Sequence, residues 1–340
     1  MKKTLLTICL VWMCFSLSAQ KIIDLSGKWS FSIDRQDNGE KEKWFSHTLN
    51  DFINLPGSMP EKLKGDEVTA KTQWTGSLYD SSYYYNPYME KYRKEGNIKF
   101  PFFLTPDKHY VGAAWYQKEV NIPADWKGER ILLFLERPHI ETTVWVNGQK
   151  TGMQNSLCVP HQYDITRYVR PGKCTITIRV DNRIKEINVG PDSHSITDQT
   201  QGNWNGIVGR ICLQTTPKTY FDDIQIYPEP EQKLARVKVV IKGAGITKIK
   251  LSAESFNTDK KHIVPAIQQE IKLNKGVTET EMVLPMGNDM LLWDEFHPAL
   301  YKLKAEVTNG KKTEIKEIQF GIRRFEIKGK WFYVNGRKTQ

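Results

Sequence analysis

Apolar and polar residues alternate with a period of two along most of this chain. Ile176, Ile178 and Val180 fall on one face of an expected strand, and segments 236–242 and 301–307 alternate in the same way. This period is typical of half-buried antiparallel strands. The strands recur at short intervals, with Gly, Pro, Asn and Asp between them, as in sandwiches and barrels. The pattern therefore predicts an all-β protein without long helices.

The character of the strands changes near residues 216–220. Residues before this point are rich in Trp, Tyr and loops, whereas those after it form shorter and cleaner alternating runs. The second part has about the 100 residues of an immunoglobulin-like sandwich. We expect one domain over 20–218, a second over 219–322 and the start of a third over 323–340.

The first residues have the features of a secretory signal peptide. Lys2 and Lys3 precede a short apolar run over 5–17, and Ala19 ends a stretch of small residues. The apolar run is shorter than the roughly 20 residues that a membrane span needs, and no other segment is long enough either. We expect cleavage after Ala19 and a periplasmic or secreted product.

Charge and cysteine content narrow the function classes. The net charge of +10 is spread thinly, without a run of five Lys or Arg, which argues against a nucleic-acid partner. Cys158, Cys174 and Cys212 remain after removal of the signal; one disulfide is possible, but buried free thiols fit the apolar surroundings of Cys174 and Cys212 better. Neither zinc-type spacing nor a phosphate-binding loop is present, so we expect no metal and no cofactor.

Eight segments in a fixed order resemble the sandwich domains of family 2 glycoside hydrolases, which include β-galactosidase, β-glucuronidase and β-mannosidase. The most specific is 139–152, in which Asn147-Gly148 favours a tight hairpin turn. The other segments are 24–31, 55–59, 114–119, 163–166, 179–182, 203–213 and 292–301. Together they cover nearly the whole chain after the signal peptide.

The resemblance implies a jelly-roll, galactose-binding-like sandwich followed by an immunoglobulin-like sandwich. Two short apolar runs in 325–334, with a turn at Asn335-Gly336 and a third strand expected beyond it, resemble the first hairpin of the family's (β/α)8 barrel. That barrel supplies both catalytic glutamates, one within an Asn-Glu motif, and no Asn-Glu dipeptide occurs here. We therefore expect the non-catalytic front part of a retaining, β-galactosidase-like enzyme that is inactive without its barrel.

In the family, two segments of the jelly roll project towards the active-site mouth. Carried over by resemblance, the substrate-binding residues are Asn182, Gln201, Asn203, Trp204 and Asn205. Amide side chains can pair with sugar hydroxyls, and an indole can stack on a pyranose face. The alternative for Asn182 and Asn203 is that they satisfy turn backbones, and for Trp204 that it packs internally.

An aromatic-rich insert between Trp74 and Tyr110 departs from the compact family pattern. So many aromatic side chains either dock on the barrel or bind glycan, and we favour docking. The expected partners are therefore an oligosaccharide and the enzyme's own barrel. Two alternatives remain: a stand-alone carbohydrate-binding protein and a non-enzymatic interaction module.

Overall fold

The computed structural model describes residues 21–69, 71–75, 85–99, 105–185, 198 and 202–339. The expected signal peptide, 1–19, lies outside these residues. The described chain forms two compact units, an N-terminal unit of residues 21–215 and a C-terminal unit that starts at residue 216.

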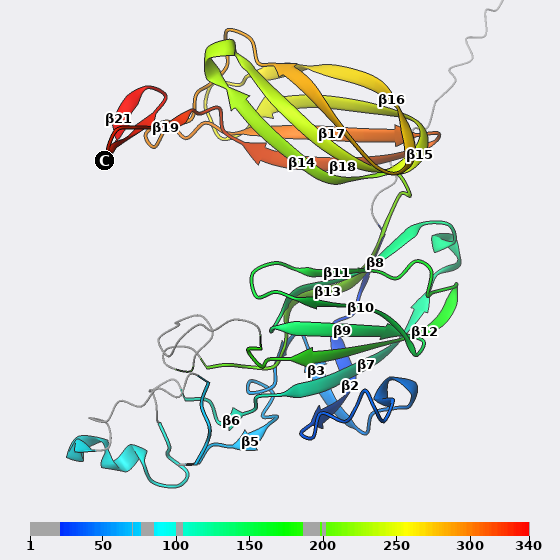
Figure 1. Cartoon of the computed structure of the whole chain (residues 1–340), viewed down its shortest axis with the longest axis vertical. Coiled ribbons are helices and arrows are strands. Elements are labelled where there is room, and N and C mark those ends of the chain that lie inside the picture. Colours follow the sequence, from blue (N-terminus) through cyan, green and yellow to red (C-terminus); the bar gives the residue numbers. More distant parts are fainter. Residues whose placement is uncertain are drawn as a thin grey trace, which may run out of the picture. The chain divides into compact units, whose positions relative to one another are not determined.

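The N-terminal unit is a sandwich of two antiparallel sheets (Figure 1). In the described residues, one sheet has the order β1 (Ile22–Asp24), β13 (Gly206–Thr216), β8 (Arg130–Pro138) and β11 (His161–Asp164), with β4 (Gly57–Ser58) beside β13. The other has the order β10 (Gln149–Asn155), β9 (Glu141–Val146), β12 (Gly172–Asp181), β7 (Ala113–Ile122), β2 (Gly27–Asp34) and β3 (Asp51–Leu55). A short ribbon pairs β5 (Asp66–Glu67) with β6 (Lys108–His109). Three-residue 3-10 helices lie at η1 (Trp44–Ser46) and η3 (Ala124–Trp126).

The core of this unit lies between the two sheets. It includes the fully buried Trp29, Phe31 and Tyr116, with Ile176 and Ile178 from β12. Burial of each large apolar side chain contributes about 1.5–3 kcal/mol. The predicted all-β jelly-roll class is confirmed, and the predicted Asn147-Gly148 turn joins β9 to β10 with both residues at positive φ.

The outer face of the six-stranded sheet differs from the simple alternation that the sequence suggests. Thr177 and Arg179 point away from the core, yet both are buried. Residues 35–50, which we call the clasp, cover this face. Phe45 of the clasp stacks on Trp145, with ring centroids 5.1 Å apart and planes 5° from parallel. The sequence pattern cannot show that a loop shields this side of the sheet.

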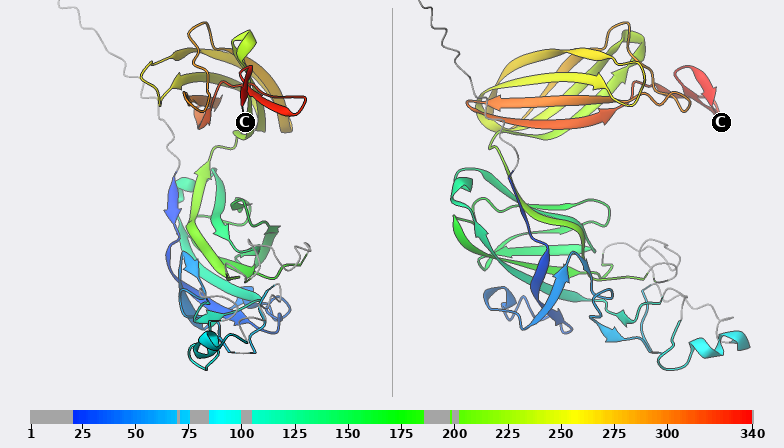
Figure 2. Two further views of the ribbon diagram at one scale, coloured as in Figure 1. Left: turned by 90° about the vertical axis from the view of Figure 1, so that its left-hand side faces the viewer. Right: turned by 180° about the vertical axis from the view of Figure 1, so that it is seen from behind.

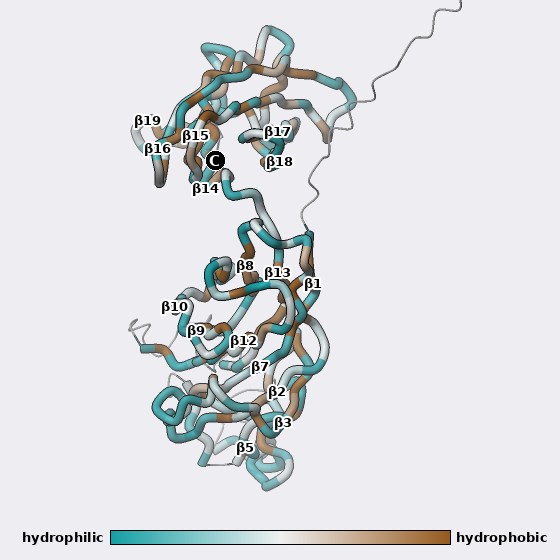
Figure 3. Tube along the Cα trace, turned by 90° about the vertical axis from the view of Figure 1, so that its right-hand side faces the viewer, coloured by the Kyte–Doolittle hydropathy of each residue, from teal (hydrophilic) through white to brown (hydrophobic). Residues whose placement is uncertain are grey.

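The C-terminal unit is an immunoglobulin-like sandwich, seen from two further directions in Figure 2. Its described strands are β14 (Tyr220–Glu229), β15 (Leu234–Ser255), β16 (Ile263–Pro285), β17 (Tyr301–Asn309) and β18 (Lys312–Phe320), with 3-10 helix η4 (Pro230–Gln232) after β14. Strand order is β14-β15-β17-β18, and β16 pairs with β15. The predicted alternation is confirmed, because Val237, Val239 and Ile241 are buried and their neighbours are not. Figure 3 shows this alternation as changes between brown and teal along β15 and β16.

Glycines allow the long β15–β16 hairpin to bend in the middle. The first half of β15 pairs with β14 and the second half with β17. Gly243, with φ of 155°, lies at this change, and a Cβ there would be 2.6 Å from Oγ1 of Thr219. A register shift between Gly243 and Gly245 marks the bend. One hairpin therefore contributes to both layers of the unit.

A small three-stranded sheet follows the C-terminal sandwich. It contains β19 (Phe325–Lys328), β20 (Trp331–Val334) and β21 (Arg337–Thr339). The predicted Asn335-Gly336 turn is present, with both residues at positive φ. A third strand was expected after this turn but outside residues 1–340; instead, β21 forms it from Arg337 to Thr339, which pair with β20.

The aromatic-rich insert is described only in part. Trp74 is buried against His109, with ring centroids 4.6 Å apart. Tyr85 and Tyr88 are each 84% exposed, and Tyr88 lies on the 3-10 helix η2 (Pro87–Tyr92). The remaining tyrosines of the insert and Phe100, Phe102 and Phe103 lie outside the described residues, except for Tyr92 and Tyr110.

Three further sequence expectations can be compared with the described residues. Cys174 and Cys212 are buried free thiols, and burial raises the pKa of Cys174 to about 11. Every helix in the described residues is too short or too polar to cross a membrane. Within the same residues, no three His, Cys, Asp or Glu side chains cluster closely enough to hold a metal ion.

Candidate functional site

The described residues of the predicted site, Asn182, Asn203, Trp204 and Asn205, lie where the chain passes from one sheet of the N-terminal sandwich to the other. Strand β12 ends at Asp181 and strand β13 begins at Gly206, and these strands belong to opposite sheets. Of the connection between them, the structure describes residues 182–185, 198 and 202–205. The ends of both sheets therefore contribute polar groups to one region.

Asn182 is fully buried, and its side chain joins three segments of the chain. Its Nδ2 donates to the carbonyl oxygen of Tyr110 at 2.9 Å and to Oδ1 of Asn203 at 3.1 Å. Its Oδ1 accepts a hydrogen bond from the backbone N–H of Gly112 at 2.8 Å. The side chain thus ties the end of β12 to the residues that precede β7 and to the residues that precede β13.

Asn203 and Asn205 are buried in the same way. Asn203 Nδ2 donates to Oγ1 of Thr75 and to the carbonyl oxygen of Asn182, both at 3.0 Å. Asn205 Nδ2 donates to two backbone carbonyl oxygens, and its Oδ1 accepts from the hydroxyl of Tyr116 at 2.7 Å. We call Asn182, Asn203 and Asn205 the amide cluster.

The side chains of the amide cluster have no free N–H group. An Asn side chain has two N–H donors, and all six donors of the cluster bond to protein oxygens. These side chains therefore hold the backbone around the site, as the structural alternative anticipated. A direct bond from them to a sugar stays a prediction. Trp204 is half-buried and stacks on His139 at 4.5 Å, while Gln201 lies outside the described residues.

Asp198 connects the amide cluster to the aromatic-rich insert. The carboxylate is buried and accepts hydrogen bonds from the backbone N–H groups of Thr75 at 2.6 Å and Asn203 at 2.5 Å. His109 Nε2 lies 3.5 Å from the same carboxylate. This residue gave no signal in the sequence, because it is an isolated acid in a loop without a motif.

His139 is a second buried histidine of this region. Burial lowers its pKa to about 4, and the nearby Asn203 side chain and the charge of Asp198 oppose this shift only in part. Its Nε2, like that of His109, has no hydrogen-bond partner among the described residues. The imidazole is therefore neutral over the physiological pH range.

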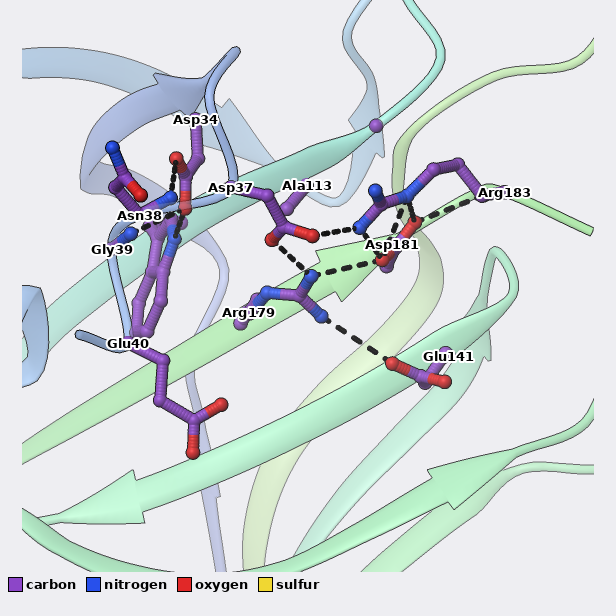
Figure 4. Close-up of polar contacts among 12 residues, drawn as sticks. Asp34, Asp37, Asn38, Gly39, Glu40, Ala113, Glu141, Arg179, Asp181 and Arg183 are labelled. Carbon is purple, nitrogen blue, oxygen red and sulfur yellow. Dashed lines mark hydrogen bonds and ion pairs between the residues drawn. The ribbon is translucent and has the colours of Figure 1, made fainter. Parts of the chain in front are cut away.

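A network of ion pairs surrounds Asp181, which directly precedes Asn182 of the amide cluster. It joins three carboxylates and three cations, which we call the ionic cluster: Asp37, Glu141, Arg179, Asp181, Arg183 and Lys185. Figure 4 shows all of these residues except Lys185. Asp181 is its centre, since its carboxylate bonds to Arg179 at 2.9 Å, to Arg183 at 2.6 Å and to Lys185 at 2.8 Å. The carboxylates and cations balance, so the cluster is compensated internally.

The ionic cluster keeps Asp37 and Asp181 charged. Burial alone would raise the pKa of Asp181, but hydrogen bonds from Arg183 and Lys185 and the charge of Arg179 outweigh it and lower that pKa strongly. The same balance between burial and the two arginines lowers the pKa of Asp37. A general acid needs a pKa near the working pH. Asp37 and Asp181 are therefore suited to positioning, not to proton transfer.

The ionic cluster was not predicted from the sequence, although a signal for it exists. Residues 179, 181, 183 and 185 read Arg, Asp, Arg and Lys, so charges of both signs recur with the period of a strand. The alternation of apolar and polar residues in β12 suggested that the face with Thr177 and Arg179 meets solvent. Because the clasp covers it, Arg179 and Asp181 are buried instead.

The fold is that of the sandwich domains of glycosyl hydrolases. Residues 22–217 match the model of the sugar binding domain of glycosyl hydrolases family 2, and residues 219–323 match a second family 2 model. The chain belongs to glycoside hydrolase family 2.

Relatives in this family are named for two activities. The chain is 24% identical to a β-glucuronidase of Paenibacillus borealis, with 94% of the chain and 48% of the relative covered. It is 24% identical to human β-glucuronidase, with 92% and 46% covered. A β-galactosidase of Oenococcus oeni is 23% identical, with 94% and 29% covered. The chain spans about half the length, or less, of these curated relatives.

Solved structures agree on the fold. A β-glucuronidase of an uncultured Clostridium species superposes with a TM-score of 0.62 at 23% identity, over 94% of this chain and 48% of that one. A Ruminococcus gnavus β-glucuronidase in complex with uronic isofagomine gives a TM-score of 0.62 at 18% identity, with the same shares covered. At these identities the likeness concerns the fold.

Proposed function

We propose that this chain is the non-catalytic N-terminal part of a secreted family 2 glycosidase that hydrolyses terminal β-glycosides with retention of configuration. The observation that carries the proposal is the succession of two family 2 domains over 22–217 and 219–323, in a chain about half as long as relatives named as glycosidases. A retaining enzyme of this kind uses two carboxyl groups about 5 Å apart, which the barrel would supply.

The substrate is a terminal β-linked sugar. A β-galactoside is what the sequence resemblance implies, and the names of the relatives add a β-glucuronide. The described part of the site contributes rigidity, because the amide cluster holds the connection between β12 and β13. Gln201 and Trp204 are the residues of this connection that we propose as sugar contacts.

The enzyme's own barrel is the proposed partner of two surfaces. Strands β19 to β21 would begin the barrel, and the aromatic-rich insert would dock on it. Phe325, Ile327 and Phe332 are exposed apolar side chains of the three-stranded sheet, and such side chains in one patch are typical of a contact surface. Docking would remove them from water.

Comparison of two polypeptides tests the function: residues 20–340, and a product of the coding sequence extended beyond codon 340. We expect the extended product to hydrolyse an aryl β-galactoside or an aryl β-glucuronide and to release the β-anomer first, as NMR can follow. Residues 20–340 should be inactive. Release of the α-anomer, or no hydrolysis by the extended product, would refute the proposal.

Export has its own test. We propose cleavage after Ala19, because Lys2, Lys3 and a short apolar run precede it. Mass spectrometry of the protein from the periplasm or medium should give a chain that starts at Gln20. A chain that retains Met1, or lipid on Cys14, would contradict it.

One observation favours a second function, glycan binding by the chain alone. Tyr85 and Tyr88 are exposed, and tyrosine rings can stack on sugar rings. Calorimetric titration of residues 20–340 with oligosaccharides should then show binding that the change of both tyrosines to Ala abolishes. Absence of binding would leave the hydrolase proposal alone.

A further inference from the structure

We propose that Asp37, a clasp residue, is a positioning residue of this site: it fixes, through Arg183, the segment 182–185 from which the sugar-facing connection departs. This inference rests on the proposed function, since it assigns to Asp37 an effect on sugar binding. Asp37 lies outside the motifs that resemble the family.

The carboxylate of Asp37 bridges two arginines of one strand end. Oδ1 accepts a hydrogen bond from Nη2 of Arg179 at 2.7 Å, and Oδ2 accepts one from Nη2 of Arg183 at 2.5 Å (Figure 4). Arg179 lies within β12 and Arg183 lies beyond its end. One side chain of the clasp therefore links the strand to the segment that leaves it.

Each polar side chain of segment 182–185 is bound to a different part of the unit. Asn182 binds the backbone at Tyr110 and Gly112, Arg183 binds Asp37, and Lys185 binds Glu141 at the start of β9 at 3.0 Å. Asp181, the last residue of β12, also pairs with Arg183 and Lys185. Three separate anchors fix a segment of four residues, and Asp37 is the only one of them from the clasp among the described residues.

The clasp itself stays in place without the Asp37 carboxylate. Asp34 accepts hydrogen bonds from the backbone N–H of Gly39 at 2.8 Å and from Nε1 of Trp115 at 2.9 Å. Phe45 packs on Trp145, and Glu40 pairs with Lys150 at 2.7 Å. Removal of the Asp37 charge therefore affects Arg183 more than it affects the clasp.

Asn is the suitable replacement at this position. Asp37 has φ of 54°, and Asn tolerates this left-handed conformation as Asp does. The Asp37→Asn variant keeps the shape of the side chain and loses its charge, so the two charge-assisted bonds are weakened. Arg179 keeps Asp181 and Glu141 as partners.

Hydrogen exchange of residues 20–340 tests the anchoring. We expect peptides that contain residues 182–185 to exchange about tenfold faster in Asp37→Asn, the effect of one weakened charge-assisted bond. The matched control is Glu40→Gln, which removes the charge of the clasp residue that pairs with Lys150 and should leave these peptides unchanged. If Asp37→Asn does not fold, Arg183→Gln removes the same bridge from the side of the arginine. Unchanged exchange in the folded variant would overturn the inference.

Kinetics of the extended product separate positioning from simple stability. Asp37→Asn should raise KM about tenfold with little change in kcat, because the weakened contact serves substrate binding, and Glu40→Gln should match the wild type. An equal rise of KM in both variants, or a fall of kcat alone, would overturn the role of Asp37. Inactivity of the wild-type product would refute the proposed function, while the exchange experiment would still decide the anchoring.

Discussion

Asn182 and Asn203 are bonded to each other by two hydrogen bonds. Nδ2 of Asn182 donates to Oδ1 of Asn203 at 3.1 Å, and Nδ2 of Asn203 donates to the backbone oxygen of Asn182 at 3.0 Å. Both residues are buried. The two ends of the connection between β12 and β13 are thus joined directly, so the connection leaves and returns at one place.

The first prediction concerns this pair of asparagines. Asn182→Ala leaves the N–H of Gly112 and the oxygen of Tyr110 without the Asn182 side chain, and an unpaired buried polar group costs about 1–3 kcal/mol. We expect each of Asn182→Ala and Asn203→Ala to lower the free energy of unfolding by that amount. Urea denaturation measures this loss, and the exposed Asn121→Ala is the control.

The double variant gives a sharper result. Since the two side chains bond to each other, the loss in the double variant should be smaller than the sum of the single losses by at least about 0.5 kcal/mol. Strict additivity would show that the pair does not act as a unit.

The second prediction concerns pH and His139. Its pKa is about 4 in the folded protein and 6.5 in the unfolded chain, so the unfolded chain binds more protons between these values. The stabilising contribution is fully present above pH 6.5 and is lost as the pH falls towards 4. At 1.36 kcal/mol for each pKa unit, the loss is on the order of 3 kcal/mol.

Denaturation at pH 7, 6, 5 and 4 can test this dependence. His139→Gln does not titrate and should lose less stability between pH 7 and 5 than the wild type. The exposed His47→Gln should follow the wild type. If His139→Gln and the wild type lose equal stability over this range, the buried imidazole is not the cause.

The fold could be predicted from sequence because its strands are regular. In β15 and β17 apolar side chains recur at every second residue, and this regularity allows the immunoglobulin-like unit to be predicted. Two features escaped the pattern. The clasp covers the outer face of β12 through long-range contacts of Phe45 with Trp145, and β21 forms from three residues that carry no apolar alternation.

The candidate site could be predicted only in its location. Resemblance placed Asn182, Asn203 and Asn205 together, and the structure brings them together with Thr75 and Asp198. Their bonding partners could not be predicted, because Tyr110, Gly112 and Tyr116 lie about 70 to 90 positions away in the sequence. Such contacts depend on the packing of strands from both sheets.

The third prediction concerns Gly206, at the start of β13. Its φ is 146°, and a Cβ there would lie 2.5 Å from the backbone oxygen of Gly57 and 2.8 Å from the Cα of Ser58. Gly206 pairs with Ser58 of β4, so neither strand can move without breaking this pairing. Gly206→Ala should therefore cost at least about 3 kcal/mol of unfolding free energy.

Gly128→Ala separates collision from backbone strain. Gly128 has φ of 86°, but a Cβ there would meet nothing within 4 Å. We expect it to cost only about 1 kcal/mol, the strain of a left-handed residue. Urea denaturation of both variants measures the difference. Equal losses would mean that β4 yields to the added methyl group, and that the close approach of β4 and β13 next to Asn205 is not a rigid feature of the site.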